Sequence, residues 1–566
     1  MTDSSSQVLV VGAGPAGLTA AHELLRRGIS VRLIDAAPGP APTSRALATH
    51  ARTLEIYDQM EILDILLPQG RIMQKFTIHQ NGSQLAALGA DYSQLPTRFP
   101  MTVLVDQAIT ETVLRDAVSR LGTEVEWGKR LDSVEQDGTG VTAIVRDGDG
   151  TEEKLRTDWL VGCDGGHSTV RKLLGLRLLG DSTETWLIAD AEVDTDMDTH
   201  SLHWLRSGSD AMMAVPFPKE RKWRLLDTAD ASYDGDAAAV GARFSEKLSR
   251  ALGRQVTVHE PSWVSVFTIQ QRMITAMRSG RCFVAGDAAH VHSPASGQGM
   301  NTGIQDAYNL GWKLAAVIRG EAADPLLDTF AAERVPVGAK LLGSTKNATR
   351  LIALQERIVG LVLPPFFKVL GLFPALLMMI SRKVMRAMSA LDLDYRDSPL
   401  TTAALATAPG STVKAPKALW PTPGRRVSEF TEAQESDPGC ADLLRELRDV
   451  RWTLLVGDAG RAASWAVPER LDRQYAEWLS VRTVCAGTGG GTADADAVRP
   501  LHDPSGTVAR RLHLRSDGWI LVRPDGYVAS RGDHGAEDLL AEALRIGTGG
   551  LVTAGPPAAR GSLGKH

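Results

Sequence analysis

The chain has 566 residues and a formal net charge of -5, from 62 basic and 67 acidic side chains. This near balance excludes a general electrostatic attraction for nucleic acid, and the length exceeds what one hydrophobic core supports. About one domain per 150 residues predicts three or so folding units. The four cysteines lack CxxC or CxxH spacing, so we expect no metal site, no disulfide framework and a reducing, cytoplasmic location. Residues 1–7 lack the basic and long apolar regions of a signal peptide, and export is not expected.

The N-terminal segment predicts a βαβ unit. Residues 7–11 form an apolar strand, residues 15–27 a helix and residues 31–34 a second strand. A nucleotide-binding α/β domain therefore begins at the N-terminus.

The turn of this unit reads GAGPAG, which contains Gly12, Gly14, Ala16 and Gly17. The glycines allow a tight turn and close approach of the backbone to a pyrophosphate, which the helix N-terminus attracts. Asp35 ends the second strand, where a carboxylate accepts hydrogen bonds from an adenosine ribose. The pattern predicts a dinucleotide site but does not distinguish FAD from NAD.

Two segments, residues 76–90 and 185–228, alternate apolar and polar residues between turns, which is typical of half-buried antiparallel strands. We expect them to form a substrate-binding sheet inserted into the nucleotide domain. The apolar candidates for the substrate pocket are Met212, Met213, Pro216, Phe217 and Trp223. Strand alternation places Met212 and Pro216 on one face and Met213 and Phe217 on the other, so only one pair can line a pocket.

Residues 302–318 repeat apolar side chains at the spacing of one helix face. Residues 358–380 are as long and apolar as a membrane span, but three prolines and Lys368 interrupt them, and we expect a buried or interface-forming helix. No internal repeat is found.

Two further motifs, CDGGHSTVR at residues 163–171 and GRCFVAGDAAHVHSPASGQGMNTGIQDAYNLGWKLA at residues 280–315, resemble the DG and GD motifs of the group A flavoprotein aromatic hydroxylases. With GAGPAG they follow the family's usual order. The resemblance continues through residues 326–334, 391–400 and 521–532, and is closest to the phenol hydroxylase and polyketide hydroxylase branch.

This resemblance implies a non-covalent FAD and a set of cofactor contacts. Asp287 would bind a ribityl hydroxyl, although a role as a helix N-cap is the alternative. The loop of residues 297–301 would direct amides at the flavin's pyrimidine edge, where negative charge develops on reduction. His167 departs from the family pattern, and we expect a surface histidine there. The full set of implied contacts is Arg45, Gln107, Leu131, Asp164, Asp287, Pro294, Gly297, Gly299, Met300 and Asn301.

The resemblance also implies an activity, that of an FAD-dependent monooxygenase using NAD(P)H and O2 to hydroxylate an aromatic, polycyclic molecule through a flavin C4a-hydroperoxide. Baeyer-Villiger oxygenation by the same intermediate is an open alternative, and a non-catalytic dinucleotide-binding sensor is a more remote one. We assign no catalytic base, since a structural role is favoured for both His203 and Tyr92. A homodimer is left open as the assembly.

The expected fold class is α/β, a Rossmann-like FAD-binding domain with an inserted antiparallel sheet. The C-terminal region reads as a compact α/β unit, which the resemblance makes thioredoxin-like. The expected division is residues 1–75, 101–184 and 266–400 for FAD binding, 76–100 and 185–265 for substrate, 401–423 as linker, 424–546 as the thioredoxin-like domain, and 547–566 as a disordered tail.

Overall fold

The computed structural model describes residues 6–43, 46–89, 95–208, 210–292, 297–352, 379, 385–386, 388–401, 421–458, 467–485, 499–533 and 537–550. The chain divides into two compact units: Met1–Trp312, Arg334–Leu393 and Glu429–Glu435 form the first, and Lys313–Glu333, Asp394–Ser428 and Ser436–His566 form the second. The predicted segment 358–380 and the predicted linker fall mostly outside the described residues, as does the tail beyond residue 550. None of the described helices is long and apolar enough to span a membrane.

The first unit opens with the expected βαβ arrangement, β1 (Val8–Val11), α1 (Pro15–Leu25) and β2 (Val31–Asp35). Strand β1 is wholly buried and pairs in parallel with both β2 and β12. The six-stranded sheet has the order β19 (Arg278–Ser279), β20 (Cys282–Val284), β12 (Trp159–Gly162), β1, β2 and β8 (Val125–Trp127). Parallel strands with helical crossovers confirm the mixed α/β class.

Smaller elements complete this part of the unit. Two three-stranded sheets join β11 (Glu152–Thr157), β10 (Val141–Arg146) and β9 (Arg130–Gln136), and β3 (Ala48–Thr49), β7 (Thr102–Leu104) and β4 (Arg71–Met73). The helices are α2 (Ala51–Gln59), α3 (Leu63–Leu66), α4 (Gln107–Arg120), α5 (Thr169–Leu173) and α11 (Glu432–Glu435), with 3-10 turns η1 (Leu67–Gln69) and η2 (Gly286–Ala288). Helices α7 (Gly299–Ile318) and α8 (Pro325–Ile352) belong to the first unit only in part, because residues 313–333 belong to the second unit.

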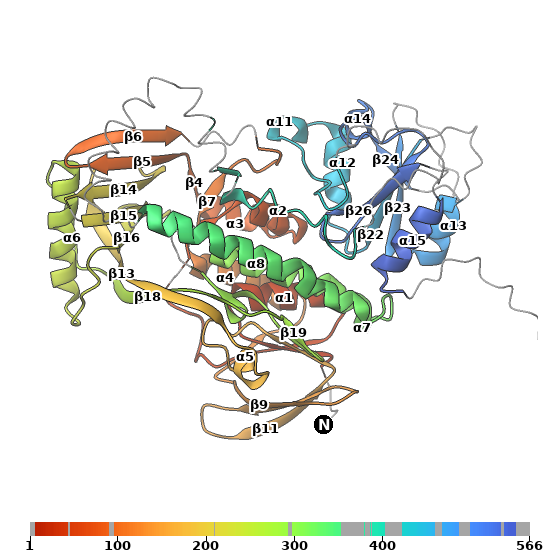
Figure 1. The fold of residues 1–566 in the computed structure, drawn as a ribbon, viewed down its shortest axis with the longest axis horizontal. Coiled ribbons are helices and arrows are strands. Elements are labelled where there is room, and N and C mark those ends of the chain that lie inside the picture. The colour runs from red at the N-terminus through yellow and green to blue at the C-terminus, as the bar shows by residue number, and fades with distance from the viewer. Residues whose placement is uncertain are drawn as a thin grey trace, which may run out of the picture. The chain divides into compact units, whose positions relative to one another are not determined.

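A nine-stranded sheet forms the rest of the first unit (Figure 1). Its order is β21 (His290–Val291), β18 (Trp263–Met273), β13 (Leu179–Asp194), β16 (Lys222–Asp227), β15 (Asp210–Pro216), β14 (Ser201–Ser207), β5 (Lys75–Gln80) and β6 (Ser83–Gly89), with β17 (Thr257–Val258) beside β13. The two segments expected to form this sheet do pair, but β5 and β14 run in parallel, so an entirely antiparallel sheet is wrong. The parallel pair arises because β5 reaches the sheet from a segment far earlier in the chain.

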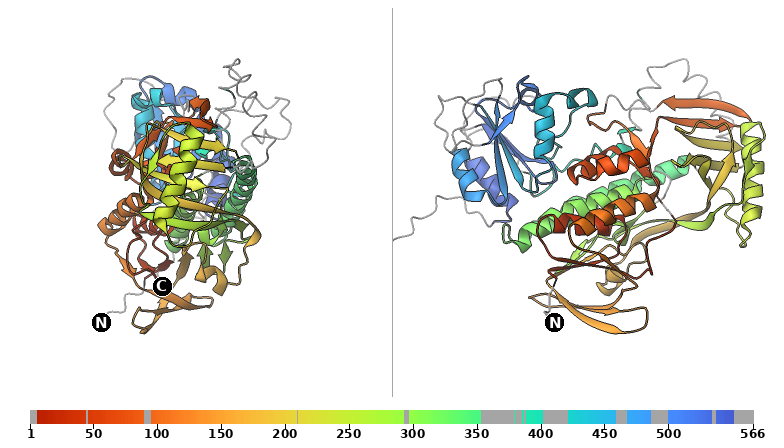
Figure 2. Two further views of the ribbon diagram at one scale, coloured as in Figure 1. Left: turned by 90° about the vertical axis from the view of Figure 1, so that its left-hand side faces the viewer. Right: turned by 180° about the vertical axis from the view of Figure 1, so that it is seen from behind.

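One face of this sheet is covered by α6 (Ala237–Leu252), which lies across the strands in Figure 2. The helix begins at Asp236, whose side chain accepts a hydrogen bond from Ala239 N at 3.0 Å, and ends at Gly253 with φ 67°. Its apolar side chains, among them Phe244 and Leu248, pack against Leu187 and Leu225 of the sheet. This core separates one face of the sheet from solvent.

The second unit contains a five-stranded sheet with the order β24 (Pro500–His502), β23 (Leu479–Cys485), β22 (Trp452–Gly457), β25 (Gly518–Val522) and β26 (Val528–Asp533). Strands β22, β23 and β24 are parallel, whereas β25 and β26 are antiparallel to their neighbours. Its helices are α12 (Pro438–Glu446), α13 (Val467–Tyr475), α14 (Thr507–Arg511) and α15 (Glu537–Gly547). Within this unit Glu333 forms buried ion pairs with Lys313 Nζ at 2.7 Å and Arg523 Nη1 at 2.6 Å.

Candidate cofactor-binding site

In the glycine-rich turn between β1 and α1, the fold requires glycine at positions 12 and 17 but not at position 14. Gly12 has φ 102°, and a Cβ there would lie 2.5 Å from the carbonyl oxygen of Cys163. A Cβ on Gly17 would lie 1.8 Å from the carbonyl oxygen of Gly12. Around Gly14, in contrast, a Cβ would meet no heavy atom within 4 Å. The start of α1 at Gly14 is therefore open, as the approach of a pyrophosphate to the helix N-terminus requires.

The GAGPAG turn lies against the GD motif. A Cβ on Gly286 would be 3.0 Å from Cβ of Ala16 and 3.5 Å from Cα of Gly303. Three segments far apart in the sequence, at the starts of α1, η2 and α7, thus approach closely enough to require small residues. Ala16 contributes to this packing.

Asp35 lies half-buried at the end of β2. Its Oδ2 accepts a hydrogen bond from Ala13 N at 2.7 Å, and its Oδ1 accepts one from Ala37 N at 2.8 Å. Each carboxylate oxygen has two lone pairs, so Asp35 retains capacity for ribose hydroxyls beside the glycine-rich turn.

Asp287 has an exposed side chain in η2, directly after the parallel strand β20. The residue that caps η2 is Ala285, and no side chain caps this turn. The alternative role of Asp287 as a helix N-cap is therefore wrong for η2. An exposed carboxylate at the carboxyl end of a parallel strand is placed as the ribityl contact requires.

The loop before α7 is held by the side chain of Asn301. Its Oδ1 accepts from His50 N at 2.9 Å, and its Nδ2 donates to the carbonyl oxygens of Ala48 at 2.9 Å and Gly297 at 2.8 Å. The buried Asn301 side chain thus fixes the loop against Ala48 and His50, at the junction of β3 and α2. Helix α7 begins at Gly299, three residues before the predicted start, so Met300 lies in its first turn.

Gly297 has φ 62°, and a Cβ there would lie 3.0 Å from Cβ of Ala48. This positive φ and close approach explain why a glycine stands at this point of the loop. Pro294, expected near the flavin ring, lies outside the described residues.

Gln107 supports the segment that follows Arg45, which is itself outside the described residues. Its Oε1 accepts from Ala46 N at 2.8 Å, and its Nε2 donates to Glu111 Oε1 at 2.7 Å. Gln107 is the first residue of α4, which Asp106 caps through a 3.0 Å hydrogen bond from Ala108 N. Leu131 on β9 has a buried side chain and is paired with Val145, so only its backbone is available to an adenine.

The DG motif has a local structural role that the sequence did not predict. Asp164 accepts hydrogen bonds from Ser168 Oγ at 2.5 Å, Thr169 N at 2.7 Å and Val170 N at 3.0 Å, so it supports the start of α5, whose N-cap residue is Ser168. Arg171 then donates from Nη1 to the carbonyl oxygen of Ala288 at 2.9 Å. Sequence reasoning missed Arg171, which connects the DG and GD motifs. His167 is exposed, as expected.

The substrate candidates fall on opposite faces of the nine-stranded sheet. Met213 and Phe217 pack with Trp186 and Ile269 on the face away from α6, together with Ala48 beside the α7 loop. Met212 and Trp223 belong to the core beneath α6, and Pro216 is the cross-strand partner of Trp223. The interpretation of Met212, Pro216 and Trp223 as pocket residues is therefore wrong, because α6 covers their face.

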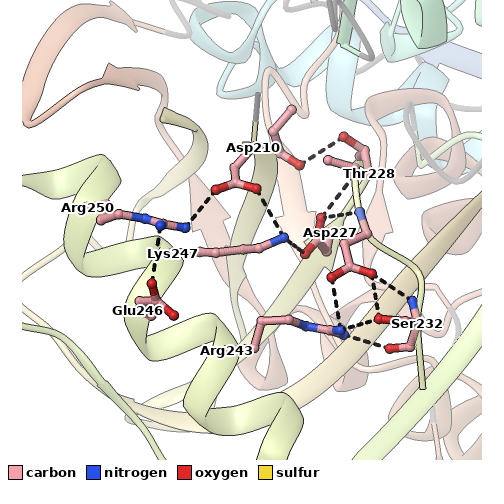
Figure 3. Close-up of polar contacts among 11 residues, drawn as sticks. Asp210, Asp227, Thr228, Ser232, Arg243, Glu246, Lys247 and Arg250 are labelled. Carbon is pink, nitrogen blue, oxygen red and sulfur yellow. Dashed lines mark hydrogen bonds and ion pairs between the residues drawn. The ribbon is translucent and has the colours of Figure 1, made fainter. Parts of the chain in front are cut away.

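Figure 3 shows polar contacts that hold α6 against the sheet. Lys247, buried on the helix, lies between two carboxylates, with Nζ 2.6 Å from Asp227 Oδ2 and 3.2 Å from Asp210 Oδ1. Arg250 also reaches Asp210, at 2.9 Å. Since breaking a buried pair is costly, this face is not expected to open for a ligand.

His203 lies on the covered side of the sheet. Its Nδ1 and His79 Nε2 are 3.0 Å apart, its Nε2 is 2.9 Å from the carbonyl oxygen of Asp198, and its ring is 5.8 Å from that of Trp223. These contacts fit the structural role that was favoured for His203. Tyr92 lies outside the described residues. Within the described part of the chain, no group of three or more His, Cys, Asp or Glu side chains could hold a metal ion.

Comparisons with known proteins place these features in context. A family model described as "FAD binding domain" matches residues 5–345. The chain is 46% identical over 540 residues to 6-methylpretetramide 4-monooxygenase of Streptomyces rimosus, covering 95% of this chain and 93% of that protein. It is 31% identical to pentachlorophenol 4-monooxygenase of Sphingobium chlorophenolicum, covering 96% of each.

Two solved structures extend the likeness to the fold. The anhydrotetracycline hydroxylase of Streptomyces rimosus aligns with a TM-score of 0.71 and 28% identity, over 98% of this chain and 100% of that one. A ternary complex of aklavinone-11 hydroxylase with FAD and aklavinone aligns with a TM-score of 0.72 and 25% identity, over 97% and 100%.

Proposed function

This chain belongs to the flavin-dependent monooxygenases that share the FAD binding domain, and from that premise we propose that it hydroxylates a polycyclic aromatic molecule of polyketide type. The observation that carries the proposal is the 46% identity, over 95% of the chain, to a monooxygenase named for a polycyclic substrate, 6-methylpretetramide. Anhydrotetracycline hydroxylase and aklavinone-11 hydroxylase, which resemble the whole chain, are also named for polycyclic substrates.

The protein's own part is to bind and orient the cofactor and the substrate. The open start of α1 at Gly14 would receive the pyrophosphate, Asp35 the ribose, and the exposed Asp287 the ribityl chain. The first amides of α7, near Met300 and Asn301, would stabilise negative charge on the flavin's pyrimidine edge. Bound FAD, reduced by NAD(P)H, would supply the oxygenating chemistry through reaction with O2 at its C4a carbon.

Met213 and Phe217 are the substrate contacts that we retain. They lie on the sheet face that also carries Trp204 and Phe267, partly buried aromatic side chains packed against the same cluster. Aromatic side chains of this kind favour flat, polycyclic molecules, and the Lys222 and Arg224 side chains lie over the Phe217 ring, 4.2 Å and 5.2 Å from its centroid.

The alternatives are weaker. The names of two relatives, 6-methylpretetramide 4-monooxygenase and pentachlorophenol 4-monooxygenase, favour aromatic hydroxylation over Baeyer-Villiger oxygenation. A non-catalytic sensor does not account for close similarity to monooxygenases over 95% of the chain.

We also propose that the C-terminal domain is thioredoxin-like and structural. The order β22, α13, β23, β24, α14, β25, β26 and α15, with β22 between β23 and β25, supports this interpretation. The four cysteines of the chain are all free, and burial raises the pKa of the Cys440 thiol to about 12, so Cys440 is not a reactive thiolate.

A coupled assay tests the proposed function. The holoenzyme, purified with released FAD identified after acid treatment, is screened with polycyclic phenols for stimulated oxidation of NADPH and NADH. Oxidation should rise at least about tenfold with a true substrate, a barrier change of about 1.4 kcal/mol. The proposal is wrong if the released cofactor is NAD, or if no aromatic compound stimulates oxidation.

A further inference from the structure

The buried side chains of Asp306, His290 and His292 are joined in one hydrogen-bonded chain, the His292 chain. None of the three is among the proposed cofactor contacts. Nε2 of His290 is 2.5 Å from Oδ2 of Asp306, and Nε2 of His292 is 2.8 Å from Nδ1 of His290. The three residues are 0 to 7% exposed. They come from β21, the residue that follows it, and α7.

Asp306 is the fixed, charged end of this chain. Its Oδ1 accepts from Arg334 Nε at 2.6 Å, and its Oδ2 also accepts from Gly286 N at 3.1 Å. Burial opposes its ionisation, but the charges of His290 and Arg334 outweigh burial and lower the pKa of Asp306 to about 2. At physiological pH the Asp306 carboxylate therefore accepts hydrogen bonds and does not donate one.

The acceptor character of Asp306 determines the proton positions along the chain. In its neutral form His290 donates from Nε2 to the carboxylate, and its Nδ1 is then the acceptor for Nε2–H of His292. A neutral His292 then presents a bare lone pair at Nδ1. This Nδ1 is buried and makes no hydrogen bond. A buried polar atom of this kind is satisfied when a ligand group approaches it.

The His292 ring lies on the side of the sheet that carries the retained substrate candidates. His290 is the cross-strand partner of Met273, and such pairs share a face. Met273 and Ile269 are four residues apart on β18, so they point the same way, and Ile269 packs in the cluster of Met213 and Phe217. The hydrogen bond between the two histidine rings keeps His292 on this side.

We propose that Nδ1 of His292 accepts the proton of an acidic hydroxyl group on the bound aromatic substrate, with His290 and Asp306 as positioning residues. The proposal rests on the proposed function, because a phenolate ring is more electron-rich than a phenol and reacts more readily with an electrophilic oxygen. In this step the substrate O–H bond breaks, an Nδ1–H bond forms, and the electron pair stays on the substrate oxygen. The positive charge on His292 is compensated by the Asp306 carboxylate through His290.

Three influences set the protonation state of His292. Burial is the largest influence and lowers its pKa well below the ordinary value, His290 lowers it further, and Asp306 raises it. The ring is therefore neutral at pH 7, and the Asp306 carboxylate is the group that favours the protonated ring when Nδ1 accepts a proton. Arg334 on α8 acts on Asp306 rather than on His292, since its Nε is bonded to that carboxylate.

The test is the variant His292→Gln in the FAD-loaded full-length protein. Glutamine can keep the contact with His290 but cannot accept a proton. The coloured phenol alizarin, 1,2-dihydroxyanthraquinone, is titrated while bound, and its visible spectrum reports the fraction ionised. We expect the ionisation constant of bound alizarin to be at least about tenfold lower in the variant. With the best substrate from the aromatic screen, kcat at pH 7 should fall by about 100-fold or more and recover as pH rises to the substrate's own ionisation, with KM within a few-fold.

Two controls separate this effect from damage to the fold. His259→Gln removes an exposed histidine that pairs with Asp194, and should change neither the spectrum nor the pH profile. FAD content and melting temperature are compared for all variants, and His292→Asn serves if the glutamine variant does not fold.

Equal pH profiles of kcat in wild type and both His292 variants would overturn the proposal, as would equal alizarin ionisation. This result differs from failure of the proposed function, in which wild-type protein would oxygenate no aromatic compound at all. If alizarin does not bind, the kinetic pH profile decides.

Discussion

Substituting Gly14 by alanine tests the cofactor role of the glycine-rich turn separately from its structural role. Gly14 has φ -74° and ψ -179°, which alanine adopts freely, and its added methyl group would meet no protein atom within 4 Å. Loss of a glycine at the N-cap costs at most about 1 kcal/mol. The apoprotein should therefore keep its fold.

The same methyl group would stand where the pyrophosphate approaches the amides at the start of α1. Displacing a phosphate from one or two charge-assisted hydrogen bonds costs about 1.5 to 3 kcal/mol. The Kd for FAD should consequently rise by about ten- to a hundredfold. In Gly17→Ala, by contrast, the new Cβ would lie 1.8 Å from the Gly12 carbonyl oxygen, so the backbone must move and the fold itself should be lost or strongly destabilised.

The assay is FAD binding to apoprotein by flavin fluorescence, with melting temperature measured on the same samples. We expect Gly14→Ala to lose affinity at an unchanged apoprotein melting temperature, and Gly17→Ala to melt early or fail to fold. Unchanged FAD affinity in a folded Gly14→Ala protein would refute the placement of the pyrophosphate.

Three further predictions follow from single features. Asp287→Ala should raise the Kd for FAD by about ten- to a hundredfold without altering the fold, since the side chain is exposed; equal flavin occupancy at limiting FAD would contradict the ribityl assignment. The double variant Cys440→Ser, Cys485→Ser should keep turnover within a few-fold, and activity that responds to thiol reagents in the parent but not the variant would revive a redox role. Burial, His203 and Arg254 lower the pKa of His79 to about 4, so the unfolded chain takes up a proton near pH 6.5 before the folded protein does. The melting temperature should fall between pH 6.5 and 4, and this fall should be smaller in His79→Gln. An equal fall in both proteins would contradict the lowered pKa of His79.

The elements with strong local signals could be predicted from the sequence. An apolar strand, GAGPAG and a second strand ending in Asp35 give the βαβ unit directly, because the spacing of glycines and apolar residues is set by local geometry. The parallel pairing of β5 with β14 could not be predicted, since alternation gives the faces of a strand but not the direction of its partner.

The position of the candidate site could be predicted from the sequence, but the roles of its individual side chains could not. Alternation separated Met213 from Met212, yet only the packing of α6 decides which of them is core. Asp164 accepts hydrogen bonds from the first two amides of α5, and these bonds form within the DG motif itself. The His292 chain depends on Asp306 and Arg334, which are brought together by helix packing and leave no spacing pattern in the sequence.

Turnover under 18O2, with mass analysis of the product, tests the central claim most directly. The polycyclic phenol that best stimulates NAD(P)H oxidation is used as substrate, with the FAD-loaded protein and unlabelled water. Aromatic hydroxylation predicts one labelled oxygen on a ring carbon of the product. A label in a new ester or lactone would identify Baeyer-Villiger chemistry instead, and an unlabelled product would contradict monooxygenation of that substrate.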